Sequence, residues 1–304
     1  MSMHRILFAE DDPTTRMVVS EFLRSECYDV IAVEDGQYAI EALAMDSNFD
    51  LLLSDIDMPR LQGHMLLSRV EKMYPDIRRV LLTGYDADKY MSIATQFGIS
   101  NIITKTNPFN LKDLGAYLGG LLRADIFGIT RYLDESTDTT KLEVLNSRDI
   151  APFIKQLLED HPLEDGGMLE QAFVEVLTNA VYYGVFDSDG ANKHEWESDI
   201  DVPPGQVELE YGSDDEKLVV GIKDTGGKLD KKKIMFWLSR QIRKNAMGLP
   251  LGLTDSHGRG LFLSREYMDR LVVNIERGAR TEIICVKYLK TVYEGPKPLL
   301  INEI

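Results

Sequence analysis

Short apolar runs alternate with helix-like segments over the first 120 or so residues, and this alternation limits the possible folds more than any other feature. Runs of this length predict buried strands, and the amphipathic segments between them have the period of helices. Strands that alternate with helices predict an α/β domain with a doubly wound parallel sheet. The predicted strands are residues 4–9, 28–33, 50–54, 78–83 and 101–105, which makes the sheet five-stranded.

Polar side chains stand at the carboxyl ends of these strands, where a doubly wound sheet has its functional crevice. Crowded carboxylates repel one another unless a hard cation such as Mg²⁺ lies among them, and a lysine or threonine beside them can contact an incoming anion. The set predicts a phosphoryl-transfer site with an aspartate as acceptor. For any single strand-end aspartate, a solvated helix cap remains the alternative. The residues concerned are Glu10, Asp11, Asp12, Asp55, Thr83 and Lys105.

Composition narrows the class of protein further. The 304 residues are enough for two domains, and a formal net charge of −16 has the wrong sign for binding a nucleic-acid backbone directly. No run of 18 or more apolar residues and no secretion signal is visible, so we expect a cytoplasmic protein without a membrane segment. Cys27 and Cys285 are too few for a disulfide framework and are expected to be free thiols.

Residues 1–122 resemble a response-regulator receiver domain, a flavodoxin-like fold. The stretch "ILFAEDDPTTR" resembles the family's acidic strand end, "DIDMPRLQG" its phosphoacceptor loop, "VLLTG" its threonine strand and "IITK" its lysine strand. The resemblance implies phosphorylation by an upstream sensor histidine kinase. It also implies the role of each residue: Asp55 as the phosphorylated aspartate, Glu10 and Asp11 as metal ligands together with Asp55, Asp57 as the donor of a backbone carbonyl to Mg²⁺, and Thr83 and Lys105 as contacts of the phosphoryl group.

The second half of the chain has a different pattern. We expect a junction at residues 123–140, which end in small polar and acidic residues, and a second domain at residues 141–304. Helices come first and antiparallel strands later, which predicts an α+β two-layer sandwich. The expected elements are a strand at 141–145, helices at 147–160 and 167–184, two strands within 205–227 and a closing strand at 281–289.

Three short motifs in this half could form a nucleotide site. Glu175 and Asn179 lie four apart on one face of an otherwise apolar helix. Asp224 ends a strand and is followed by two glycines, the first of which is Gly226. "HGRGL" places Gly258 and Gly260 before a helix, where backbone N–H groups favour a phosphate. Each motif alone is also what an ordinary turn or helix would show.

The order of these motifs resembles the GHKL (Bergerat) ATPase superfamily, and most closely its anti-sigma-factor serine kinases. The resemblance implies ATP as a cofactor and a lid at residues 228–257. It implies that Asn179 holds Mg²⁺, that Glu175 is the general base, and that Asp224 accepts a hydrogen bond from adenine. Gly226, Gly258 and Gly260 would let the backbone approach the nucleotide.

We therefore expect a response regulator in which phosphorylation of Asp55 controls an ATP-binding output domain. The first hypothesis is a serine/threonine protein kinase that acts on a small anti-sigma antagonist. The second is a non-catalytic, nucleotide-bound switch that sequesters a sigma factor or a similar partner. The third, an atypical histidine kinase, lacks the family's histidine hairpin. The last receiver helix, at about 110–122, should pack against the output domain or against a second subunit in a homodimer.

Overall fold

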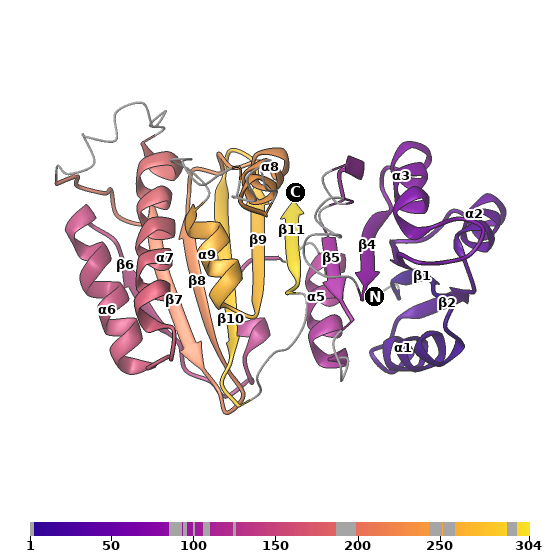
Figure 1. The fold of residues 1–304 in the computed structure, drawn as a ribbon, viewed down its shortest axis with the longest axis horizontal. Coiled ribbons are helices and arrows are strands. Elements are labelled where there is room, and N and C mark those ends of the chain that lie inside the picture. Colours follow the sequence, from indigo (N-terminus) through magenta and orange to yellow (C-terminus); the bar gives the residue numbers. More distant parts are fainter. Residues whose placement is uncertain are drawn as a thin grey trace. The chain divides into compact units, whose positions relative to one another are not determined.

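A computed structural model gives the fold of the chain (Figure 1). The structure describes residues 3–84, 93, 96–99, 101–105, 110–123, 126–186, 199–242, 251, 259–290 and 297–304. It divides into two compact units, the first formed by Met1–Ile126 with Glu294–Leu300 and the second by Phe127–Tyr293 with Ile301–Ile304. Within the described residues, no helix is both long enough and apolar enough to cross a membrane.

The first unit contains the expected parallel sheet, in the order β2-β1-β3-β4-β5. Strand β1 pairs in parallel with β2 on one side and with β3 on the other. The strand order reverses between β1 and β3, so a crevice is expected at the carboxyl ends of these two strands. Leu299 and Leu300, the first residues of β11 (Leu299–Glu303), pair antiparallel with β5. The parallel strands are β1 (Arg5–Ala9), β2 (Asp29–Val33), β3 (Leu51–Asp55), β4 (Arg78–Thr83) and β5 (Asn101–Thr104).

Helices flank this sheet, and aspartates begin two of them. Asp12 accepts a hydrogen bond from the backbone nitrogen of Thr15 at the start of α1, and Asp35 accepts two at the start of α2. Helix α1 packs with α5, and α2 packs with α3. The helices are α1 (Pro13–Ser25), α2 (Gly36–Met45), α3 (Gly63–Met73) and α5 (Leu111–Arg123).

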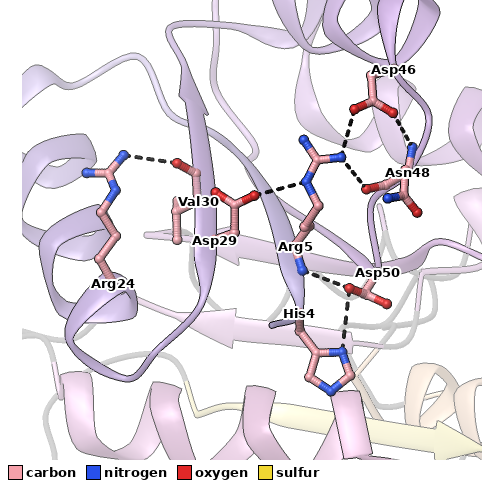
Figure 2. A network of polar contacts seen from close by, with 8 residues as sticks. All are labelled: His4, Arg5, Arg24, Asp29, Val30, Asp46, Asn48 and Asp50. Atoms are coloured by element: carbon pink, nitrogen blue, oxygen red, sulfur yellow. Dashed lines mark hydrogen bonds and ion pairs between the residues drawn. The ribbon is translucent and has the colours of Figure 1, made fainter. Parts of the chain in front are cut away.

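Arg5 connects the amino-terminal ends of the strands, at the end of the sheet opposite the crevice (Figure 2). Its Nε donates to Asp29 at 3.0 Å, and its Nη1 donates to Asp46 at 2.7 Å and to the carbonyl of Asn48 at 2.8 Å. Its backbone nitrogen donates to Asp50 at 2.7 Å. One side chain therefore connects β1, β2 and the loop that leads into β3.

The second unit is built on an antiparallel sheet in the order β9-β10-β8-β7-β6. Strands β7 and β8 form the expected hairpin, and β10 is the expected closing strand. Two further strands, β9 and β11, fall where no strand was expected from the sequence. The strands of this sheet are β6 (Thr140–Glu143), β7 (Val207–Ser213), β8 (Lys217–Asp224), β9 (Arg270–Glu276) and β10 (Arg280–Tyr288).

One face of this sheet is covered by helices α6, α7 and α9 (Figure 1). Helix α7 stops at Asn179 and continues as a π-helix, η3, whereas the sequence predicted one helix as far as Gly184. The helix predicted at 147–160 begins as a 3-10 turn, η2, which is capped by Asn146. The elements are η2 (Ser147–Asp149), α6 (Ile150–Asp160), α7 (Gly166–Asn179), η3 (Ala180–Val185), α8 (Lys231–Ile242) and α9 (Arg259–Tyr267).

Residues 127–139, hereafter the covering segment, lie across the opposite face of the sheet. Ile129 is fully buried and sits where Gly221 has no side chain, since a Cβ on Gly221 would lie 2.5 Å from the Cγ2 of Ile129. The backbone nitrogen of Gly128 donates to both carboxylate oxygens of the buried Glu282, at 3.0 and 2.9 Å. Most of the expected junction, residues 123–140, thus belongs to the second unit, with Ile129, Tyr132 and Leu133 buried.

Candidate functional site

The acidic side chains at the ends of β1 and β3 meet in the first unit. Each of Glu10, Asp11 and Asp55 offers a carboxylate oxygen, and these oxygens all lie within 4.8 Å of one another. Glu10 is fully buried and Asp55 nearly so, whereas Asp11 is exposed. Three hard oxygen donors with one side open to solvent fit Mg²⁺, which keeps part of its water shell.

Lys105, which directly follows β5, completes this cluster. Its Nζ lies 2.5 Å from Oδ1 of Asp55 and 2.8 Å from Oε2 of Glu10. Burial alone would lower the pKa of Lys105, but the carboxylates of Asp55 and Glu10 outweigh it and raise that pKa. Burial raises the pKa of Glu10, and the ammonium of Lys105 opposes this shift. The lysine therefore stays charged and neutralises part of the crowded negative charge.

The loop after β3 is held close to Asp55. The backbone nitrogen of Asp57 donates to Oδ2 of Asp55 at 2.8 Å, and that of Gly63 donates to the carbonyl of Ile56 at 2.9 Å. A Cβ on Gly63 would lie 1.8 Å from the carbonyl oxygen of Asp55, so only glycine allows this approach. Thr83 ends β4 beside the crevice, and its carbonyl accepts from the backbone nitrogen of Lys105 at 2.7 Å.

Residues 6–118 match the family model of the response regulator receiver domain. The response regulator receiver protein CpdR of Brucella abortus is 34% identical over 112 residues, which cover 37% of this chain and 91% of that protein. The chain belongs to the response regulator receiver family. The response regulator protein FleR of Pseudomonas aeruginosa is 31% identical over 110 residues, which cover 36% of this chain and 23% of that protein.

Solved receiver domains are similar over the same region. A CheY-like receiver domain from Methanospirillum hungatei is 26% identical, with a TM-score of 0.37, and the match covers 41% of this chain and 98% of that one. The response regulator protein TrrA from Thermotoga maritima, solved in complex with Mg(2+)-BeF, is 27% identical, with a TM-score of 0.35, and the match covers 38% and 97%. The chain spans between about a tenth and a third of the length of the first curated relatives that it matches.

Membership of this family makes the chain a two-component response regulator with a receiver domain. Receiver domains are phosphorylated by upstream histidine kinases. The strand order of the first unit and the acidic cluster at its crevice agree with this assignment.

In the second unit, Asp224 ends β8 as a buried carboxylate, 6% exposed, on the helix-covered face of the sheet. Its Oδ1 accepts hydrogen bonds from the backbone nitrogens of Gly226 at 2.9 Å and Gly227 at 3.3 Å. Burial raises the pKa of Asp224 to about 6, although these two N–H groups oppose the shift. A buried carboxylate with a perturbed pKa is a candidate binding group.

Glycines allow the end of the π-helix to approach this carboxylate. A Cβ on Gly184 would lie 2.6 Å from Cγ of Asp224, and a Cβ on Gly226 would lie 1.7 Å from the carbonyl oxygen of Gly184. π-Helical turns are frequent at functional sites because they place a backbone where an α-helix would not. The sequence motif therefore brings Asp224 and Gly226 together, and Gly184 is a contact that the sequence did not reveal.

Helix α7 carries the other two predicted polar residues of this half. Gly260, in the first turn of α9, packs against Glu175, since a Cβ on Gly260 would lie 3.1 Å from the Cβ of Glu175. Asn179 is the last residue of α7 and directly precedes the π-helix that leads to Gly184. Gly258 lies outside the described residues, as does most of the predicted lid after residue 242.

Thr281 is a candidate site residue that the sequence did not single out. It lies directly opposite Asp224 in the β8–β10 register and is 1% exposed. Its hydroxyl interacts with the Asp224 carboxyl and lowers the pKa of that group, against the effect of burial. Only the strand register places it beside Asp224, and a single sequence does not reveal a pairing between residues so far apart.

Proposed function

We propose that Asp55 is the phosphoacceptor of the receiver domain. Its carboxylate oxygen forms a bond to phosphorus while the P–N bond of the donor phosphohistidine breaks, and the imidazole nitrogen leaves with the electron pair. Lys105 and Thr83 contact the transferred phosphoryl group. Carboxylates of Glu10, Asp11 and Asp55, with the backbone carbonyl of Asp57, are the residues that would hold Mg²⁺, which when bound neutralises charge on the phosphoryl oxygens.

We further propose that the second unit binds ATP. The observation that carries this proposal is the buried carboxylate of Asp224, which is held by two backbone N–H groups and closely approached by Gly184. Such a fixed acceptor can receive a hydrogen bond from the adenine amino group. Asn179 is the proposed Mg²⁺ ligand, and Gly226, Gly258 and Gly260 are the proposed points of close backbone approach to the nucleotide.

With ATP bound, the proposed activity is that of a serine/threonine protein kinase of the anti-sigma-factor type, acting on a small protein antagonist. Glu175 orients the acceptor hydroxyl and takes its proton. The hydroxyl oxygen then bonds to the γ-phosphorus while the bond to the β–γ bridging oxygen breaks, and ADP leaves. Phosphorylation of Asp55 is proposed to control this step.

A second candidate is a nucleotide-dependent switch that binds a sigma factor or similar partner without transferring phosphate. One contact favours it: α9 begins beside Glu175, so close that a Cβ on Gly260 would lie 3.1 Å from Cβ and 3.2 Å from Cγ of Glu175. An atypical histidine kinase has no comparable observation in its favour.

Calorimetry with Mg²⁺-ATP and Mg²⁺-GTP tests the nucleotide site. The parent should bind ATP more tightly than GTP, and Asp224→Asn should remove about 1 to 3 kcal/mol of ATP binding. Asp214→Asn is a matched control, because Asp214 also accepts two backbone hydrogen bonds but does so at the other end of β8. If the parent binds ATP and GTP equally, Asp224 does not select adenine.

Transfer of radiolabel from ATP separates the two candidates once a protein partner is in hand. A kinase phosphorylates the partner and loses this activity with Glu175→Gln. A switch binds the partner only with nucleotide present and leaves it unlabelled.

A further inference from the structure

The outward face of α8 combines cationic and aromatic side chains. Lys232 and Lys233 are exposed in the first turn, and Phe236 follows one turn later with 51% of its surface exposed. Trp237 packs edge-on against Phe236 with ring centroids 5.2 Å apart, and the guanidinium of Arg240 lies 5.7 Å from the centre of the Phe236 ring. These five residues define the α8 patch.

The opposite side of the helix explains why this face stays outward. Ile234, Met235 and Leu238 are all buried, at 1%, 5% and 0% exposure. Apolar residues one turn apart on that side anchor α8 to the second unit. Phe236 lies on the other side of the helix, so its exposure is not a failure to reach the core. An exposed aromatic ring beside an arginine has the composition of a protein-binding surface.

The charge of the α8 patch contrasts with that of the whole chain. Residues 231–242 contain three lysines and an arginine and no acidic residue, whereas the chain as a whole carries a net charge of −16. Asp230 pairs with Lys233 at 3.4 Å, beyond the amino end of the helix. A local positive patch on an acidic protein attracts acidic groups at short range, while the overall charge repels a long polyanion.

We propose that the α8 patch is a docking surface for an acidic segment of another protein that also carries an apolar side chain. The acidic groups pair with Lys232, Lys233 and Arg240, and the apolar side chain packs on Phe236 and Trp237. Leu251, 37% exposed, extends the apolar part, since its carbonyl accepts from Arg240 at 3.2 Å. A nucleotide phosphate would explain the lysines but not the exposed ring.

The position of α8 in the second unit also supports this proposal. Helix α8 packs against α9, and α9 begins at the contact between Gly260 and Glu175. A segment docked on α8 would therefore sit on a helix adjacent to the proposed nucleotide site. The docking itself does not require nucleotide.

Fluorescence anisotropy with three synthetic peptides of equal length tests this surface on the full chain. One peptide is rich in glutamate and carries two leucines, the second has serine for leucine, and the third has glutamine for glutamate. The first should bind more tightly than either of the others, with an affinity that falls as salt rises. The measurement is made without nucleotide, so its failure is separate from a failure of the ATP proposal.

Variants locate the binding. Lys232→Glu with Lys233→Glu should weaken binding of the first peptide by at least tenfold, and Phe236→Ala by about fivefold. Two exposed residues of the same unit provide matched controls, Lys155→Glu and Met168→Ala, which should leave the affinity within twofold of the parent. Circular dichroism on each variant verifies that the fold is retained.

Several results would overturn the proposal. These are no binding of the acidic peptide, equal binding of the glutamine peptide, or an equal loss in the control variants. Displacement of the peptide by single-stranded DNA of the same charge would make the patch a general polyanion surface. A dimer by light scattering that Phe236→Ala dissociates would make a second copy of this chain the occupant.

Discussion

The crevice of the receiver and the turn around Asp224 are both built on a carboxylate at a strand end, but they are stabilised in different ways. At the crevice, Glu10 and Asp55 are held by charge, with the ammonium of Lys105 within 2.8 Å of each. At the turn, backbone N–H groups hold Asp224, and Gly184 and Gly226 leave room for close backbone approach. The first site balances charges that a phosphoryl group and a cation would change. The second site is a rigid backbone turn that presents one hydrogen-bond acceptor, the carboxylate of Asp224.

This difference predicts which substitutions damage which site. Removal of a charge should abolish function at the crevice while leaving the backbone in place. Addition of a single methyl group should damage the Asp224 turn, because its glycines already lie at the limit of contact.

The largest effect is expected from Asp55→Asn. With acetyl phosphate and Mg²⁺, the parent should gain one acid-labile phosphoryl group and the variant none, because the amide is a far weaker nucleophile than the carboxylate. Mass measurement of the intact chain detects the added group. Asp50→Asn, just before the other end of β3, should label like the parent. Equal labelling of Asp55→Asn would place the acceptor elsewhere.

Gly184→Ala should act only on the second site. The added Cβ would lie 2.6 Å from Cγ of Asp224, so the carboxylate or its turn must shift, at a cost of about 1 to 3 kcal/mol. We expect ATP affinity to fall about tenfold or more by calorimetry, with unchanged labelling of Asp55. Gly166→Ala, at the start of α7, has open space around its Cβ and serves as the control. Undiminished affinity would mean that the Asp224 turn does not contact the nucleotide.

A smaller effect is expected from pH. The pKa of Asp224 is raised to about 6, so the acceptor is ionised above that pH and protonated below it. Adenosine binding should therefore stay constant above pH 6 and weaken by up to tenfold per unit as pH falls further; adenosine avoids the titration of phosphate. Asp224→Asn should remove this dependence. The pKa of Asp224 is higher in the folded protein than in the unfolded chain, so folding favours the protonated carboxyl. The stability that this carboxyl contributes is therefore present at low pH and is lost as pH rises through about 6, whereas adenosine binding changes with pH in the opposite direction.

The smallest effect is expected from Arg5→Ala, far from the crevice. The change removes the side-chain hydrogen bonds to Asp29, Asp46 and Asn48, so the midpoint of thermal unfolding should fall while the initial rate of Asp55 labelling stays the same. Arg24→Ala, which removes one bond to the carbonyl of Val30, should lower the midpoint less. A loss of labelling in Arg5→Ala would show that the amino-terminal and carboxyl-terminal ends of the parallel strands are energetically coupled.

The part of each unit that could be predicted from sequence depends on how far apart in the sequence its contacting residues lie. In the receiver, local apolar periods give the strands, and parallel pairing then places the strand-end acids at one edge, so Glu10, Asp55 and Lys105 could be grouped in advance. Strand β9 was missed because its apolar run closely follows the helix α9, and β11 because it is a run of five residues whose pairing with β5 joins residues far apart in the sequence. The approach of Gly184 to Asp224 depends on a π-helical turn that no periodicity predicts.

The covering segment has a consequence for how the protein can be divided. Its acidic and small polar residues suggest a tether, yet Ile129 lies over Gly221, and Gly128 binds the carboxylate of Glu282. A fragment that begins at residue 141 would expose the surface that Ile129 covers and would remove the Gly128 donor of the buried Glu282, which would keep a hydrogen bond from Asn274 at 3.2 Å, and it should aggregate. A fragment that begins at Phe127 keeps these contacts. A boundary for expressing the two units separately therefore lies directly after the receiver, before Phe127, and not at the end of the acidic and small polar residues.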